Sequence, residues 1–86
     1  MADGLRTTLG QANFVVIKSH VDDILTVSEA SIVVAMKLLW TRLKIIVEPS
    51  SAVAVAAILE HKKIFFGKRV GIVISGGNVE LSQLPF

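Results

Sequence analysis

The longest regular pattern of apolar and polar positions in the chain covers residues 28–47. Apolar side chains recur there every three or four residues, as on the buried face of a helix, at Ile32, Met36, Leu39, Leu43 and Ile46. Polar residues follow a second face, expected near solvent: Lys37, Thr41 and Lys44. Ser28 can cap the start of this helix through its side chain. Pro49 excludes Glu48 from helical geometry, so the helix must end there.

Shorter apolar runs on either side predict two more helices. Residues 13–20 contain an apolar run that fits a strand or a helix, and we favour a helix capped by Asn13. Residues 52–60 begin apolar on every side, which is typical of a helix buried all round, and Ser50 or Ser51 is its expected cap. A short final helix near Val79 belongs to one of two interpretations of the turn that precedes it.

Two β-branched runs predict strands, at residues 24–27 and 69–74. The second run is bounded by basic residues and by Gly76-Gly77, and it is typical of a strand buried on both faces. Helices therefore alternate with strands, an order that favours an α/β fold with parallel strands. Two strands of this length do not make a stable sheet by themselves.

The composition is unusually apolar for so short a chain. The 86 residues allow one small domain, a single segment from residue 1 to 86, with 52% hydrophobic and 19% charged residues. A domain of this size buries only about 60% of its unfolded surface. The apolar excess therefore indicates that a partner chain, or the remainder of a larger protein, covers it; a self-sufficient monomer is the alternative.

Charge and residue types disfavour several classes of function. No apolar run is long enough for a transmembrane helix, and the N-terminal residues lack the apolar core of a signal peptide. The net charge of +2 is too small to indicate a nucleic-acid partner. His20 and His61 have no partners at metal-ligand spacing, so we expect no metal site. The absence of cysteine fits a cytoplasmic protein.

The strongest local signal for a binding site is the turn Ser75-Gly76-Gly77-Asn78, directly after the second predicted strand. Ligands of open α/β sheets bind beyond the carboxyl ends of strands, and glycine lets a ligand approach the backbone closely. Ser75 would then offer one hydroxyl to a ring nitrogen or a carboxylate. The alternative is that Ser75 and Asn78 only shape a turn and cap the final helix.

Two further groups carry polar or charged side chains in apolar surroundings. Glu48 is a carboxylate held at a helix end and suited to acid-base chemistry; the alternative is an exposed helix-end carboxylate. Trp40, Arg42 and Lys44 form the other group. Their spacing favours core packing for Trp40 and a solvated face for the two cations.

Four blocks of the chain, taken in order, are similar to consecutive blocks of one enzyme family. They are ADGLRT (2–7), VDDILTVSE (21–29), WTRLKIIVEPS (40–50) and GIVISGGNVEL (71–81). These blocks resemble pyridoxal-phosphate-dependent threonine/serine dehydratases and serine racemases. The resemblance implies the C-terminal part of a fold type II catalytic domain: an α/β fragment, a partial three-layer sheet with parallel strands and flanking helices.

The resemblance also implies which residues face the pyridoxal phosphate cofactor. Ser75 would hydrogen-bond the pyridine nitrogen, and Gly76 belongs to the same block. Glu48 would lie near the cofactor ring, and the backbone of Gly4 would lie close by. A neutral hydroxyl does not protonate that nitrogen as a carboxylic acid would, so the ring is a weaker electron sink, suited to β-elimination and, in some members, to racemisation.

A second, nucleotide-binding role is implied for two residues. Lys44 and Asn78 occupy the positions at which eukaryotic-type racemases use a lysine and an asparagine to help bind an activating ATP between subunits. The family's Schiff-base lysine and glycine-rich phosphate cradle, by contrast, lie upstream of the matched region. No lysine of this chain sits in a matching context, so catalysis by this chain alone is not expected.

The expected function is therefore the C-terminal portion of a pyridoxal-phosphate-dependent hydroxy-amino-acid ammonia-lyase. The complete enzyme would act on L-threonine or L-serine, and we expect a homo-oligomer with no nucleic-acid or membrane partner. The alternatives are a fragment of a serine racemase, or a non-catalytic remnant that docks to itself or to another subunit.

Overall fold

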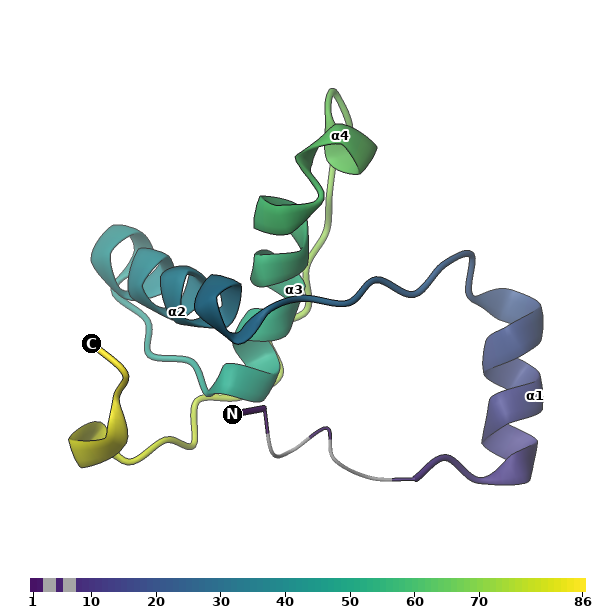
Figure 1. Ribbon diagram of the computed structural model, residues 1–86, viewed down its shortest axis with the longest axis horizontal. Coiled ribbons are helices and arrows are strands. Elements are labelled where there is room, and N and C mark those ends of the chain that lie inside the picture. The colour runs from purple at the N-terminus through teal and green to yellow at the C-terminus, as the bar shows by residue number, and fades with distance from the viewer. Residues whose placement is uncertain (3–4, 6–7) are drawn as a thin grey trace.

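The computed structural model describes residues 1–2, 5 and 8–86, and their regular structure is helical (Figure 1). The elements in chain order are α1 (Gln11–His20), α2 (Glu29–Leu43), α3 (Pro49–Glu60), α4 (Lys62–Phe65) and the 3-10 helix η2 (Leu81–Gln83). The predicted helices at 13–20, 28–47 and 52–60 correspond to α1, α2 and α3. The element nearest to the short final helix of the alternative interpretation is η2, whose N-cap is Glu80 and not Asn78.

Helix α2 begins as predicted and ends earlier. The Ser28 hydroxyl accepts a hydrogen bond from the backbone N–H of Ser31 at 3.2 Å, and Glu29 lies in the first turn. The helix ends at Leu43 because Lys44 adopts the left-handed conformation, with φ 60° and ψ 33°. The predicted end at residue 47 is therefore wrong: the chain turns away before Pro49 can act.

Helix α3 begins at Pro49, ahead of the predicted start at residue 52. Glu48 is extended, with φ −72° and ψ 157°, as its place before a proline requires. Proline suits the first position of a helix, since its missing N–H would have no partner there. The predicted cap at Ser50 or Ser51 is therefore wrong, whereas the predicted end at Glu60 is confirmed.

The hydrophobic core lies where α2 crosses α3. Its buried apolar residues are Ile32, Ala35, Met36, Leu39, Val47, Ala52 and Ala56. The predicted core positions at 32, 36 and 39 are confirmed. Leu43 and Ile46 are 62% and 39% exposed, because α2 ends and the chain changes direction between them. The predicted solvent face of α2 at positions 37, 41 and 44 is exposed, as expected.

Helix α3 is less buried than its composition predicts. Ser51, Ala52 and Ala56 are buried, and its other residues are half-buried apart from the exposed Glu60. The small alanine side chains lie against α2, which lets the two helix backbones approach closely. Among the described residues, α2 and the short α4 are the helices that contact α3.

The predicted strands at 24–27 and 69–74 do not form. Both runs belong to long connections without regular structure, and Ile24 and Val73 are 75% and 83% exposed. A strand exists only where a neighbouring strand satisfies its backbone groups, and the described residues offer neither run such a neighbour. The expected three-layer parallel sheet is consequently absent from the described residues.

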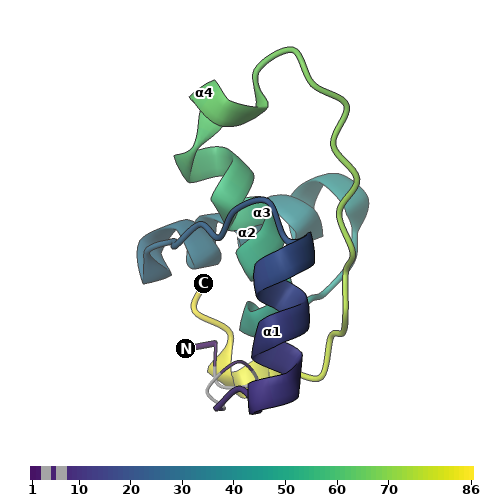
Figure 2. The same ribbon diagram turned by 90° about the vertical axis from the view of Figure 1, so that its right-hand side faces the viewer.

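Helix α1 stands apart from the pair formed by α2 and α3 in Figure 1, and in Figure 2, turned by 90°, it lies in front of that pair. It buries none of its residues, and Phe14, Val15 and Val16 remain about half exposed. Gly10 occupies its N-cap without a side-chain hydrogen bond, so the predicted cap at Asn13 is wrong. None of the helices of the described residues has the length and apolar character to cross a membrane.

Candidate functional site

Two segments far apart in the sequence meet at the start of α3. The backbone N–H of Glu48 donates to the carbonyl of Gly76 at 3.2 Å. The backbone N–H of Ser75 donates to the hydroxyl oxygen of Ser51 at 2.9 Å, and that of Gly76 approaches the same oxygen at 3.5 Å. The structure thereby brings together Glu48, Ser75 and Gly76, which the sequence indicates as one site.

The glycines of this turn are required by space. A Cβ atom at Gly76 would collide with the Oε1 of Glu48, and a Cβ atom at Gly77 would collide with the carbonyl oxygen of Ile46. Neither glycine has a positive φ, so close approach and not backbone conformation explains them. The turn therefore lies directly on the segment that leads into α3.

The two candidate polar side chains differ in exposure. Ser75 is exposed, and its hydroxyl makes no hydrogen bond with the residues that the structure describes. Glu48 is half-buried, with its carboxylate beside Gly76. The Ser75 hydroxyl is thus available to a ligand, while its backbone is held by Ser51.

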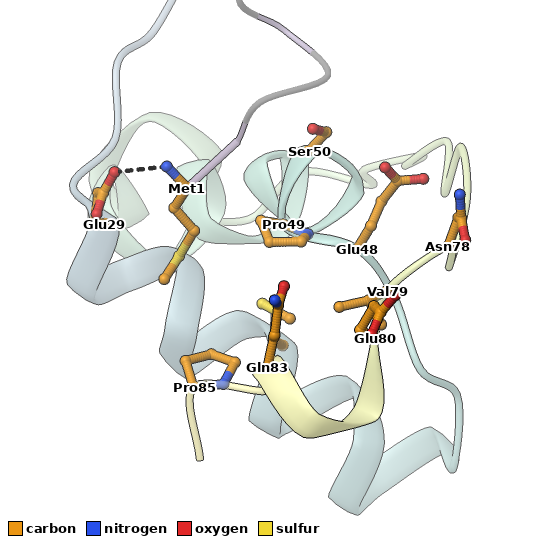
Figure 3. A pocket seen from close by; sticks show the side chains of 11 residues that line it. Met1, Glu29, Glu48, Pro49, Ser50, Asn78, Val79, Glu80, Gln83 and Pro85 are labelled. Carbon is orange, nitrogen blue, oxygen red and sulfur yellow. Dashed lines mark hydrogen bonds and ion pairs between the residues drawn. The ribbon is translucent and has the colours of Figure 1, made fainter.

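A cavity of about 530 Å³ lies beside this turn, between α2, the start of α3 and the C-terminal segment (Figure 3). It is lined by Met1, Glu29, Met36, Glu48, Pro49, Ser50, Asn78, Val79, Glu80, Gln83 and Pro85. Among the described residues, the lining carries carboxylates at positions 29, 48 and 80 and no lysine or arginine. The α-amino group of Met1 contacts Glu29 at 3.1 Å. This charge pattern disfavours a phosphate group in the cavity.

The predicted nucleotide residues are not brought to one cavity. Asn78 lines the cavity near Glu48, as Figure 3 shows. Lys44 does not line it, and its ammonium group donates to the carbonyl of Thr41 at 3.0 Å. The predicted role of Gly4 falls outside the described residues. No cluster of metal-ligating side chains occurs among the residues described.

The aromatic residue of the third group is not part of the core. Trp40 is 38% exposed, and its ring packs against Phe86 with centroids 5.4 Å apart. The predicted core packing is therefore wrong, because the C-terminal segment and not a second helix covers this indole. Arg42 is exposed, as expected for a solvated face.

A hydrogen-bonded clamp between the end of α3 and the segment before α2 was not predicted. The carboxylate of Glu60 accepts from the Ser28 hydroxyl at 2.5 Å and from the Ser28 backbone N–H at 2.6 Å. The Nε2 of His61 lies 2.8 Å from the Thr26 carbonyl oxygen, to which it donates. Hydrogen bonds from Ser28 and Ser31 hold the pKa of Glu60 at about 2, below its ordinary value of 4.5.

The sequence does contain a signal for this clamp. Glu60 is an acidic residue at the C-terminal end of a helix, where the helix dipole disfavours negative charge. A carboxylate at that position needs hydrogen-bond donors from another segment. Ser28 provides them from the N-terminus of α2.

The chain matches a known class of protein. A family profile described as "Pyridoxal-phosphate dependent enzyme" matches residues 1–76. The chain therefore belongs to the pyridoxal-phosphate-dependent enzyme family. The described residues fit that cofactor at the ring edge only: they present a free serine hydroxyl and a close carboxylate, without a phosphate cradle.

The names of two relatives within the family refer to enzymes that act on hydroxy-amino acids. The chain is 54% identical to serine racemase of Dictyostelium discoideum over 98% of its length and 26% of that protein. It is 50% identical to beta-hydroxyaspartate dehydratase of Paracoccus denitrificans, over 100% of the chain and 27% of that protein. The chain thus spans about a quarter of the length of these relatives.

Solved structures show the same backbone arrangement within much larger enzymes. The crystal structure of the Dictyostelium discoideum serine racemase matches with a TM-score of 0.85 and 55% identity, over 93% of this chain and 27% of that one. The T.th. threonine deaminase matches with a TM-score of 0.86 and 44% identity, over 92% of this chain and 27% of that one. These fold type II enzymes are α/β proteins, although the described residues here contain no strand.

Proposed function

We propose that this chain is the cofactor-facing C-terminal part of a pyridoxal-phosphate-dependent hydroxy-amino-acid ammonia-lyase. Residues 1–86 would form one segment of its catalytic domain, and the complete enzyme would deaminate L-threonine or L-serine in the cytoplasm. The observation that carries the proposal is the packing of the Ser75–Gly76 turn on Glu48, which gathers the residues expected at the cofactor ring.

The proposed chemistry of the chain rests on two side chains. The Ser75 hydroxyl would donate a hydrogen bond to the pyridine nitrogen of the cofactor, since it has no partner among the described residues. When bound, pyridoxal phosphate supplies the electron sink for removal of the α-proton and the β-hydroxyl. The Glu48 carboxylate would lie at the ring and orient it, and Gly76 would let the ring approach the backbone.

The chain supplies only part of a catalytic centre. Among the described residues, the lining of the acidic cavity offers no lysine or arginine to hold the cofactor phosphate, and the lysine that attaches the cofactor has no counterpart in a matching context. Large apolar side chains are exposed along α1 and the run before Ser75, including Phe14, Val73 and Ile74. This surface supports the presence of further protein, in a homo-oligomer or a complete domain, that covers it in the working enzyme.

Serine racemase is a second candidate, favoured by the 54% identity to a relative with that name. A racemase needs a reprotonating group on the second face of the substrate, and no residue of this chain is assigned to that role. A non-catalytic remnant that docks to itself or to another subunit is the alternative outside catalysis, favoured by the same exposed apolar surface. In a racemase, Lys44 and Asn78 would also help to bind ATP at a subunit interface.

The test is a chimera in which this chain replaces the matched segment of the Dictyostelium discoideum serine racemase. We expect the chimera to bind pyridoxal phosphate and to release 2-oxo acid and ammonia from L-threonine or L-serine. Formation of D-serine would equally support a catalytic role for this segment, because the remainder of the chimera supplies the reprotonating group. A folded chimera that binds no cofactor and acts on neither substrate would refute both enzymatic functions.

The unmodified chain provides the control for that experiment. Titration with pyridoxal phosphate, followed by borohydride reduction and intact-mass measurement, is expected to give no saturable adduct at a single lysine. A specific adduct would show that the chain holds the cofactor without further protein. Light scattering of the same sample distinguishes a docking protein, which would be an obligate dimer, from a monomer.

A further inference from the structure

We propose that Ser51 is a positioning residue that sets the orientation of the Ser75 hydroxyl toward the cofactor. The inference rests on the proposed function of Ser75 and adds a residue to which the family resemblance assigns no role. Ser51 lies in the first turn of α3 and is 2% exposed, which makes it the buried polar residue of the described part of the chain.

The hydroxyl of Ser51 is committed to the backbone of the turn. Its oxygen accepts the Ser75 N–H at 2.9 Å and lies 3.5 Å from the Gly76 nitrogen. The backbone N–H of Ser51 donates to the Glu48 carbonyl at 3.0 Å, which fixes the residue within the helix start. Ser51 therefore connects the backbone of α3 to the backbone of the residue that carries the candidate hydroxyl.

The turn is held from two sides. Ser51 accepts from the N–H groups of the turn, and the Glu48 N–H donates to the Gly76 carbonyl at 3.2 Å. These contacts fix the backbone of Ser75, and thereby the point from which its side chain reaches toward a ligand. Misplacement of a reacting or binding group by about 1 Å can cost on the order of a hundredfold in rate, so a device that fixes this backbone has a functional consequence.

The substitution Ser51→Ala removes the hydroxyl oxygen that accepts the Ser75 N–H and leaves the rest of the residue unchanged. Alanine is favourable in helices and fits among the buried alanines of α3, so the Ser51→Ala protein is expected to fold. Loss of the hydrogen bond leaves the Ser75 N–H without its partner. Ser82→Ala is the matched control, because Ser82 is exposed and makes no hydrogen bond with the described residues.

The first measurement is amide hydrogen exchange at Ser75 and Gly76 in the 86-residue chain, without cofactor. Ser51→Ala is expected to accelerate exchange at Ser75 about tenfold, which corresponds to the roughly 1.4 kcal/mol of one net hydrogen bond, and Ser82→Ala is expected to leave it unchanged. Equal exchange in the parent chain and Ser51→Ala would overturn the inference, whatever the function of the protein.

The second measurement uses the chimera with the Dictyostelium discoideum enzyme, loaded with pyridoxal phosphate that is isotope-labelled at the ring nitrogen. We expect Ser51→Ala to shift the ring-nitrogen resonance and to lower kcat per bound cofactor about tenfold, with KM for serine unchanged. Ser51→Thr, which keeps the hydroxyl, is expected to restore both values. An unshifted resonance in an active Ser51→Ala chimera would overturn the positioning role alone, whereas an inactive parent chimera would overturn the proposed function.

Discussion

The close approach of the Gly77 backbone to the Ile46 carbonyl makes a sharp prediction about the fold of the site. In Gly77→Ala the new Cβ would collide with that oxygen, which belongs to the backbone and has no rotamer through which to move away. To reach an ordinary contact of about 3.5 Å, the turn must retreat by about 1 Å. That movement would also stretch the 3.2 Å hydrogen bond between Glu48 N–H and the Gly76 carbonyl.

The magnitude follows from these two effects. Overpacking in a region that cannot relax costs about 1–3 kcal/mol, and a lost backbone hydrogen bond adds about 1 kcal/mol. We therefore expect Gly77→Ala to lower the free energy of unfolding by about 2–4 kcal/mol, and the melting temperature by about 4–8 °C for each kcal/mol. Gly76→Ala should cost less, about 1 kcal/mol, because its Cβ meets the movable carboxylate of Glu48.

The assay is urea unfolding of the 86-residue chain, followed by far-ultraviolet circular dichroism and by the fluorescence of Trp40, its single tryptophan. Gly71→Ala is the control, since a Cβ at Gly71 meets no atom within 4 Å. That variant should be neutral or slightly more stable, by about 0.4–1 kcal/mol, through the unfolded state. If Gly77→Ala were as stable as Gly71→Ala, the close packing of this turn on the start of α3 would be refuted.

Other predictions concern the clamp, the core and the end of α2. Because the pKa of Glu60 is depressed to about 2, the contribution of this carboxylate to stability is present above its ordinary pKa of 4.5 and is lost as the pH falls through about 2. Glu60→Gln should remove this pH dependence in unfolding experiments between these two pH values. An acid transition that is unchanged in the variant would contradict the clamp. Met36→Ala, at 2% exposure, should cost about 2–5 kcal/mol in urea unfolding, and a loss below about 1 kcal/mol would show that the core is not packed around it. Lys44→Gly should raise the free energy of unfolding by about 1 kcal/mol, because glycine adopts the left-handed conformation without strain. A lower melting temperature of this variant would indicate that the hydrogen bond from Lys44 to Thr41 outweighs the strain at Lys44.

The residues of the candidate site could be selected from the sequence because of their residue types. The turn at 75–78 and the glutamate before Pro49 stand out through glycine, proline and an isolated carboxylate in apolar surroundings. What the sequence did not reveal is the contact of Ser51 with this turn, because a serine at a helix start is explained equally well as a helix cap. Its role depends on a hydrogen bond to a residue 24 positions away.

The sequence by itself determined the helices. Spacing of apolar residues, the Ser28 cap and the backbone restriction before Pro49 act over a few residues, so α2 and α3 appear near their predicted places. The two β-branched runs were predicted as strands by the same local reasoning and failed, because a strand depends on a neighbour that local propensity does not supply.

The tertiary structure decided where the helices end and what they bring together. The left-handed Lys44 redirects the chain before the proline, which removes Leu43 and Ile46 from the core that periodicity predicts for them. The approach of Gly76 and Gly77 to residues 46–48, and the clamp of Glu60 on Ser28, join segments distant in sequence. Such contacts depend on the packing of α2 against α3, which a local pattern of apolar and polar residues does not predict.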